Sequence, residues 1–174
     1  MLEMTTKPFM ILLVGAPASG KSTYAQNYVA WCKAINQPVV VLSTDDIVMR
    51  MSAENRADGA ADYAADFKEL IGPAQKEFDL ALETALMLKV AVIVDRTNMS
   101  KKSRARFVQA GLKNGYTVSA MVFDVPEYAL MIRLANRAKE PGNKVIGAHI
   151  VSSMLANYER PTEEEGFSNV IDMT

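Results

Sequence analysis

Residues 15–22 read Gly-Ala-Pro-Ala-Ser-Gly-Lys-Ser, which matches the phosphate-binding loop pattern G-x-x-x-x-G-K-[ST] at every fixed position. An apolar run at residues 9–14 precedes this loop and predicts a buried strand. Residues 21–34 follow with apolar side chains on one helical face, which predicts an amphipathic helix. A strand, a glycine-rich turn and a helix are the context that the motif requires, so the sequence predicts a site for a nucleoside triphosphate with its Mg²⁺.

The chemistry expected of this loop follows from its place at the start of a helix. Backbone N–H groups there point toward anionic oxygens, and the helix dipole favours negative charge. Lys21 is expected to reach the β- and γ-phosphates of ATP or GTP, and the Ser22 hydroxyl to ligate Mg²⁺. The predicted nucleotide-binding residues of the loop are Gly15, Ala16, Pro17, Ala18, Ser19, Gly20, Lys21, Ser22 and Thr23.

Apolar strands alternate with amphipathic helices along the rest of the chain. Further strands are expected at 39–42, 90–94 and 118–123, with a short fifth at 170–171. Helices are expected after Gly72-Pro73, from Ser100 to Asn114-Gly115, from Pro126, and over 146–158, whereas 52–66 is expected to be a mobile excursion. Strands separated by helices are typical of parallel βαβ units. We therefore predict an α/β fold, a three-layer α/β/α sandwich with a parallel sheet, as a single domain over residues 1–174.

Composition restricts the classes of function. Of 174 residues, 49% are hydrophobic, which is enough for one domain with a buried core. The formal net charge is −1, so the chain lacks the overall basic charge of a nucleic-acid binder. Any nucleic-acid binding must therefore come from a local patch. The lone Cys32 excludes an internal disulfide, and the lone His149 argues against a histidine-based metal site or triad. With no signal-peptide pattern and no run approaching about 20 apolar residues, we expect a cytoplasmic protein that does not enter membranes.

Polar clusters follow two of the predicted strands, where ligands of open α/β sheets bind. Asp45 and Asp46 come after the second strand, and one of them is expected to face the site while the other caps a helix that begins near Ile47. A carboxylate near the γ-phosphate suits a kinase, because it can accept the proton of an attacking hydroxyl. The alternative is that both residues only cap the helix.

The second cluster is Asp95-Arg96-Thr97-Asn98, after the third strand. A carboxylate in this place commonly orients Mg²⁺ or its water ligands, so Asp95 joins Ser22 as a predicted metal residue. The alternative is an ordinary strand-end turn or helix cap, where Asp and Asn are favoured.

Cationic residues form two further groups. Arg133 and Arg137 are four apart on one helix face, and a polar segment follows at 138–144. We expect a lid over about 133–146, whose arginines neutralise charge on the transferring phosphate; a solvated helix end is the alternative. The other group is either a contact for an acceptor's phosphate backbone or a solvated helix face. It comprises Lys101, Lys102, Arg104 and Arg106.

In the same order along the chain, these segments resemble the kinase module of bacteriophage polynucleotide kinase. The resemblance also includes Val122-Phe123-Asp124-Val125-Pro126, and the ending at 165–171 is similar to that of related animal modules. It covers nearly the whole chain and implies transfer of the γ-phosphate of ATP to the 5′-hydroxyl of DNA or RNA. It further implies that Asp45 is the general base, that Lys21 and Ser22 serve phosphate and magnesium, and that Arg137 is the lid arginine, with Arg133 one turn before it.

The sequence departs from this family at the acceptor side. The family has an arginine three residues after the general base, where it contacts the acceptor's 3′-phosphate, but this position is Val48 and the nearest arginine is Arg50. On a helix the two-residue shift turns the side chain by about 200°. The family also has an aspartate near the third strand. When the two sequences are aligned on Thr97-Asn98, this aspartate falls at Arg96. The predicted acceptor-binding residues are therefore Asp45, Arg50, Arg96, Thr97 and Asn98.

These observations predict an ATP-dependent polynucleotide 5′-hydroxyl kinase, in which Asp45, Lys21 and Arg137 are catalytic and a nucleic acid is the substrate. One alternative is a kinase for another hydroxyl, such as a hydroxymethyluracil base in phage DNA or a small metabolite. A second alternative is a nucleotide-dependent switch that hydrolyses slowly. The Asp45 cluster and the arginine-based lid argue against a switch, because a switch needs no acceptor base.

Overall fold

Five strands form one parallel sheet in the computed structural model, which describes residues 7–139 and 144–173. The strand order is β2-β3-β1-β4-β5, so β1, which leads into the phosphate loop, lies at the centre. All four neighbouring pairs are parallel, as predicted. The strands are β1 (Phe9–Val14), β2 (Val39–Leu42), β3 (Ala91–Asp95), β4 (Thr117–Val122) and β5 (Asn169–Asp172).

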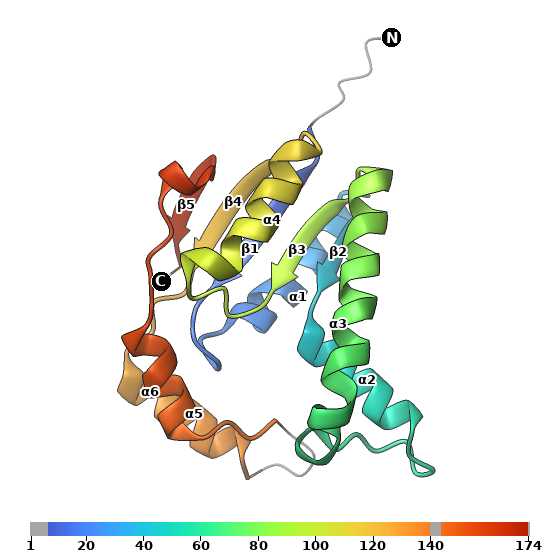
Figure 1. The fold of residues 1–174 in the computed structure, drawn as a ribbon, viewed down its shortest axis with the longest axis vertical. Helices are drawn as coiled ribbons and strands as arrows, with labels where there is room; N and C mark the ends of the chain where they lie inside the picture. The colour runs from blue at the N-terminus through green and yellow to red at the C-terminus, as the bar shows by residue number, and fades with distance from the viewer. Residues whose placement is uncertain (1–6, 140–143, 174) are drawn as a thin grey trace.

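Helices cover both faces of this sheet, which confirms the three-layer architecture (Figure 1). Alternate side chains of β1 point to opposite faces, as the two-residue period of a strand requires. Met10, Leu12 and Val14 join a core beneath α3 (Tyr63–Leu88) and α4 (Lys101–Lys113). Ile11 and Leu13 join a second core beneath α1 (Lys21–Ala34). Burial on both faces explains why β1 is an uninterrupted apolar run.

Helix α3 runs without interruption through Gly72-Pro73, where the sequence predicted a break before the helix. Proline removes one backbone hydrogen bond and is costly inside a helix. Packing offsets this cost, because Phe78 and Leu82 on the C-terminal half are buried against the sheet, and Tyr63 and Ala74 on the N-terminal half are buried beside α2 (Thr44–Glu54). Tertiary contacts on both sides of Pro73 thus outweigh the local preference.

Residues 52–66, predicted to be a mobile excursion, belong partly to two helices in the structure. The first of them end α2 and the last begin α3, which leaves only a connection over 55–62. This connection is tied down: Ser52 donates a hydrogen bond of 2.6 Å to Asp66, and Arg56 donates two to the same carboxylate. Sparse large apolar residues suggested mobility, but polar contacts between helices hold the segment.

The remaining helices lie beyond the carboxyl ends of the strands. Ser43 caps α2 by accepting a hydrogen bond from the backbone N–H of Asp46, so neither aspartate is the cap that the sequence predicted. On the other side, α5 (Glu127–Arg137) and α6 (Ala148–Ala156) lie next to each other (Figure 1). The part of the predicted lid at 140–143 lies outside the described residues. No helix in the described ranges is both long and apolar enough to cross a membrane.

Candidate active site

The loop at 15–22 connects the end of β1 to the start of α1 and needs glycine at two places. A Cβ atom at Gly15 would lie 2.8 Å from the carbonyl oxygen of Phe123, which is closer than such atoms approach. Gly20 has a φ of 107°, in the left-handed region that glycine adopts without steric cost. The loop is thereby folded tightly over the neighbouring β4 end, with its backbone gathered at the N-terminus of α1.

Lys21 is the only lysine among the described residues that is buried, with 7% of its surface exposed. Its Nζ donates hydrogen bonds to the carbonyl of Ala16 at 2.7 Å and to the hydroxyl of Ser19 at 3.2 Å. Burial lowers the pKa of Lys21 to about 8, against the opposing charge of Asp95, and Lys144 adds to the lowering. The ammonium group is therefore poised in a weakly solvated place, where an anion would favour its charged form.

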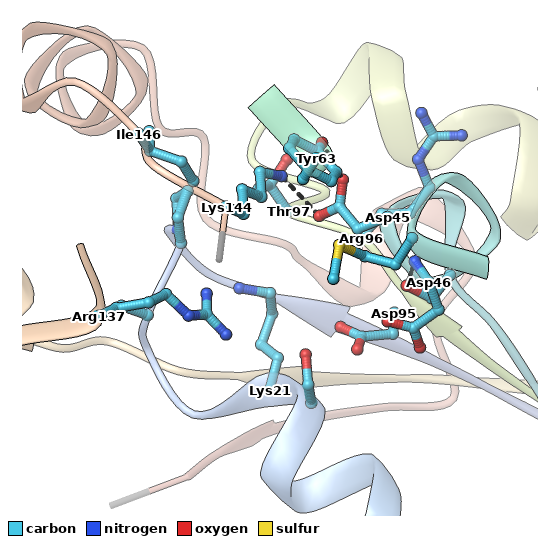
Figure 2. A pocket seen from close by; sticks show the side chains of 15 residues that line it. Lys21, Asp45, Asp46, Tyr63, Asp95, Arg96, Thr97, Arg137, Lys144 and Ile146 are labelled. Atoms are coloured by element: carbon cyan, nitrogen blue, oxygen red, sulfur yellow. Dashed lines mark hydrogen bonds and ion pairs between the residues drawn. The ribbon is translucent and has the colours of Figure 1, made fainter. Parts of the chain in front are cut away.

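Next to the loop lies a cavity of about 240 Å³, here named the central cavity (Figure 2). Its walls come from the loop, α2, the first residue of α3, the end of β3, and the segments around α5 and α6. Nine of the predicted site residues, among them Lys21, Asp45 and Asp95, thus meet in one place. The lining residues are Pro17, Ala18, Lys21, Ser22, Ser43, Asp45, Asp46, Met49, Tyr63, Asp95, Arg96, Thr97, Arg137, Lys144 and Ile146.

Asp45 is held by two side chains that the sequence did not single out. The hydroxyl of Tyr63 donates a 2.7 Å hydrogen bond to Oδ1, and Nζ of Lys144 donates one of 2.6 Å to Oδ2 (Figure 2). Burial alone would raise the pKa of Asp45, but Lys144, Tyr63 and Arg96 together hold it below its usual range. The carboxylate is therefore ionised at neutral pH and can accept a proton. No sequence motif marked Tyr63 as a site residue, and Lys144 was one of several polar residues in the segment 138–144.

Two more carboxylates stand at the other side of the cavity. Asp95 is 8% exposed and lies near the Ser22 hydroxyl, which acts to lower the pKa of Asp95. Burial raises the pKa of Asp95, and burial together with the nearby Asp95 raises that of Asp46. Carboxylate and hydroxyl oxygens that crowd together suit Mg²⁺, which commonly takes one or two carboxylates along with substrate phosphates. Asp46, expected to be a cap, thus joins this oxygen cluster.

Arg133 and Arg137 lie at the C-terminal end of α5, against the phosphate loop. Arg133 donates a hydrogen bond of 3.1 Å to the carbonyl of Ala18. Both arginines line a second cavity of about 220 Å³ with Gly20, Lys21, Ser22 and Thr23. Arg137 also lines the central cavity, where its guanidinium points toward Lys21 (Figure 2). The structure therefore places both arginines beside the loop, where their side chains remain exposed.

Arg50 does not line the central cavity. Its guanidinium forms salt bridges with Glu54 at 2.9 Å and with Glu77, on the exposed side of α2. Val48 is fully buried in a small core with Tyr63 and Ala74. Helix α2 therefore directs an apolar residue into the core at the position where the resembling family has its acceptor arginine, and Arg50 points elsewhere.

The residues that follow β3 have two different roles: some hold the phosphate loop in place, and one faces the central cavity. The Thr97 carbonyl accepts a hydrogen bond from the Gly15 N–H, and the Asn98 amide donates one to the Leu13 carbonyl at 2.8 Å, so both fix the loop. Arg96 faces the central cavity and donates to the Gln75 side chain. Asn98 itself is 3% exposed and does not line the central cavity.

Arg104 belongs to neither alternative proposed for the basic cluster of α4. Its side chain is fully buried and forms a two-point salt bridge with Glu165, at 2.9 and 2.6 Å. It also donates to the carbonyls of Asn98 and Glu159. Arg104 is thus a structural residue that fastens the segment after α6 to α4.

Comparisons with known proteins agree with this fold. A family profile described as an AAA domain matches residues 10–161. The transcription factor bHLH140 of Arabidopsis thaliana is 27% identical over 167 residues, which are 95% of this chain and 16% of the plant protein. A chain from the Pnkp1/Rnl/Hen1 RNA repair complex is 26% identical, with a TM-score of 0.65, over 90% of this chain and 45% of that chain.

A third similar structure is Kti12 of Chaetomium thermophilum in complex with ADP-AlF3. It is 18% identical, with a TM-score of 0.65, and the match covers 95% of this chain and 88% of that one. The fold is therefore that of a P-loop kinase-like module. The chain spans less than half of the RNA repair protein's length and a small part of the plant protein's.

Proposed function

The chain belongs to the AAA domain family matched over residues 10–161, and we propose that it is a polynucleotide 5′-hydroxyl kinase. In this proposal ATP is the donor, Mg²⁺ the cofactor and a DNA or RNA end the acceptor. The observation that carries it is the placement of Asp45: an ionised carboxylate lines the same cavity as Lys21 and Arg137. A donor-side lysine and arginine opposite a base are the parts that phosphoryl transfer to a hydroxyl needs.

The proposed reaction uses these residues in distinct roles. The acceptor oxygen attacks the γ-phosphorus, its proton passes to Asp45, and the bond from the γ-phosphorus to the β–γ bridging oxygen breaks to release ADP. Lys21, the loop N–H groups and Arg137 stabilise the charge on the phosphoryl oxygens. Arg133 supports the loop from α5 through the Ala18 carbonyl. The short lid segment around Lys144 would shield the reacting groups from water.

Ser22 and Asp95, with Asp46 beside them, would hold Mg²⁺. Their hydroxyl and carboxylate oxygens are the donor set that this ion prefers. Burial, together with the charge of neighbouring carboxylates, raises the pKa of both carboxyls, and a bound cation would favour their ionised forms. Bound there with the nucleotide, Mg²⁺ would neutralise phosphate charge.

One observation favours a second acceptor class. Val48 is buried and Arg50 is paired with Glu54 and Glu77, so α2 offers no cation to a phosphate beside the reacting hydroxyl. A hydroxyl on a modified base inside DNA, or on a small metabolite, would not need that contact from α2.

A transfer assay with γ-labelled ATP tests the proposal. The acceptor panel contains 5′-hydroxyl DNA, 5′-hydroxyl RNA, the same strands with 5′-phosphates, a 5′-phosphorylated hydroxymethyluracil duplex, and metabolites. The proposal expects label on the 5′-hydroxyl strands only. Label on the 5′-phosphorylated modified duplex, with none on plain 5′-hydroxyl strands, would overturn this proposal and favour the second acceptor class.

A variant pair tests the assigned base. Asp45→Asn should retain ATP binding and lose phosphoryl transfer by about 10²- to 10⁴-fold, because the amide cannot accept the proton. Asp58→Asn is the matched control, since Asp58 lies in the 55–62 connection, does not line the central cavity, and accepts a hydrogen bond from the Ala60 N–H beside it. Normal turnover by Asp45→Asn would rule out Asp45 as the general base.

A further inference from the structure

A third polar cavity of about 230 Å³, here named the basic cavity, adjoins the central cavity. Arg96 and Thr97 line both, so the two share a wall. The remaining lining comes mainly from the first two turns of α4, including Lys102, Ser103 and Arg106. The basic cavity therefore adjoins the cavity that Asp45 lines.

The charge of the basic cavity is one-sided. Three cations line it, Arg96, Lys102 and Arg106, and none of the described residues that line it is acidic. Within the described part of the chain, neither Arg96 nor Lys102 takes part in a salt bridge. Arg106 pairs with Asp79 at 3.1 Å, and both side chains are 45% exposed. This leaves a net positive surface in a protein whose formal net charge is −1.

The aromatic neighbours set the orientation of the two arginines. The Arg96 guanidinium lies 5.2 Å from the centre of the Phe78 ring, and that of Arg106 lies 4.4 Å from the centre of Phe107. A guanidinium held over a ring is pre-organised. Arg96 donates one N–H to Gln75 and Arg106 donates one to Asp79, which leaves further N–H groups for a ligand. Burial lowers the pKa of Arg96, and the charge of Arg106 adds to this effect. An anion between these cations would relieve their repulsion.

The side chains of α2 near Asp45 leave the acceptor's phosphate without a cation from that helix. Since α2 supplies Val48 to the core and turns Arg50 outward, it gives no cation to a phosphate next to the reacting hydroxyl. Arg96 is the cation that reaches from beside Asp45 into the basic cavity. Lys102 and Ser103, in the first turn of α4, line the basic cavity, so the positive end of this helix's dipole lies beside it.

We propose that the basic cavity is the subsite for the acceptor strand's phosphodiester nearest the reacting 5′ end, held by Arg96, Lys102 and Arg106. This inference rests on the proposed function, which it deepens by assigning the acceptor's phosphate contact to α4 and the β3–α4 segment. The ligand class is a single-stranded nucleic-acid end.

Lys102→Gln is the cleanest test, because Lys102 is exposed and has no ion-pair partner in the described structure. A 5′-hydroxyl oligomer labelled with a fluorophore at its 3′ end is titrated with each protein at several salt concentrations. Lys102→Gln should weaken binding and reduce the slope of log K against log salt by about 0.7. The matched control is Lys101→Gln, an exposed neighbour that does not line the basic cavity. Equal slopes for Lys102→Gln and the wild type would overturn the subsite.

Neutral linkages locate the bound phosphate. A methylphosphonate between the first and second nucleotides should weaken binding by the wild-type protein, and Lys102→Gln should then add no further loss. The same linkage near the 3′ end should leave the effect of Lys102→Gln intact. Additive losses for the first linkage would overturn the placement. Arg106→Gln, checked for its melting temperature because of its Asp79 pair, should repeat this pattern, and Lys102→Arg should restore binding.

Transfer assays on the same proteins separate this inference from the proposed function. If the wild type binds the oligomer and Lys102→Gln weakens that binding, but no label from γ-labelled ATP reaches the 5′-hydroxyl, the subsite stands and the kinase proposal falls. If transfer occurs and the acceptor KM of Lys102→Gln equals that of the wild type, the subsite alone falls. A wild-type protein that neither binds nor phosphorylates the oligomer would overturn both.

Discussion

The hydroxyl of Tyr63, the first residue of α3, donates a 2.7 Å hydrogen bond to Oδ1 of Asp45 in the first turn of α2. Tyr63 is only 5% exposed and belongs to the small core between these two helices. A buried phenol therefore fixes one oxygen of the proposed base, while Lys144 holds the other at 2.6 Å. We treat Tyr63 as a positioning residue that acts on the reaction through Asp45.

Tyr63→Phe should shift the pH dependence of transfer. The hydrogen bond stabilises the ionised form of Asp45 and contributes to its lowered pKa, so its loss raises that pKa. The base is then protonated at higher pH, and the acid limb of kcat/KM should move upward by about half a unit to one pH unit. The measurement is a pH profile of kcat/KM for the acceptor, taken on both proteins.

A surface tyrosine provides the control for this experiment. Tyr128, on α5, is 71% exposed, and Tyr128→Phe should leave the acid limb where it is in the wild type. An acid limb unchanged in Tyr63→Phe, at equal thermal stability, would mean that the phenol only fills space.

The lowered pKa of Lys21 predicts a basic limb. Lys21 is charged below its pKa of about 8 and neutral above it, and only the charged form attracts the donor's phosphates. In the free enzyme, kcat/KM for ATP should therefore fall above about pH 8, approaching tenfold per unit. Because the charge of Lys144 contributes to the lowering, Lys144→Gln should move this limb to higher pH. A profile that stays flat to pH 10 would contradict the assignment.

Magnesium dependence should report on Asp95. Asp95 and Ser22 line the same cavity and lie near each other, so in the proposed site this carboxylate either ligates the ion or orients its ligand. Asp95→Asn should raise the Mg²⁺ concentration for half-maximal transfer by about 10- to 100-fold. Chelation with EDTA should abolish transfer by both proteins, and added Mg²⁺ should restore it. An unchanged Mg²⁺ requirement in Asp95→Asn would remove Asp95 from the metal site.

The sheet and the phosphate loop could be predicted from the sequence because their signals are local. Buried strands are short apolar runs, and the loop needs glycine at Gly15 and Gly20 for reasons of space and backbone angle. Ser100 was likewise predicted to open a helix, and its side chain caps α4. Each of these features depends on residues within a few positions of one another.

The partners of Asp45 could not be predicted, because they depend on how helices pack. Tyr63 lies 18 positions from Asp45 and Lys144 lies 99 positions away. The path of α3 through Pro73 brings Tyr63 into place, and local preference argues against that path. The orientation of Arg50 similarly depends on Glu77 of α3, which no pattern in α2 reveals.

Arg104 gives the sharpest prediction on stability. Its guanidinium is fully buried, and Glu165, 5% exposed, accepts two hydrogen bonds from it at 2.9 and 2.6 Å. Arg104→Met should lower the free energy of unfolding by roughly 3–5 kcal/mol, because it leaves the Glu165 carboxylate buried without its partner. Urea unfolding measures this, provided that the m-value is unchanged.

A second ion pair at the surface serves as the comparison for Arg104. Arg160 and Asp172 bond at 2.8 Å but are 50% and 55% exposed, so Arg160→Gln should cost less than about 1 kcal/mol. Replacing both members of the buried pair, as in Arg104→Met with Glu165→Leu, should recover part of the loss, since no unpaired charge remains. If Arg104→Met unfolds at the same urea concentration as Arg160→Gln, then the buried pair does not hold the segment after α6 to α4.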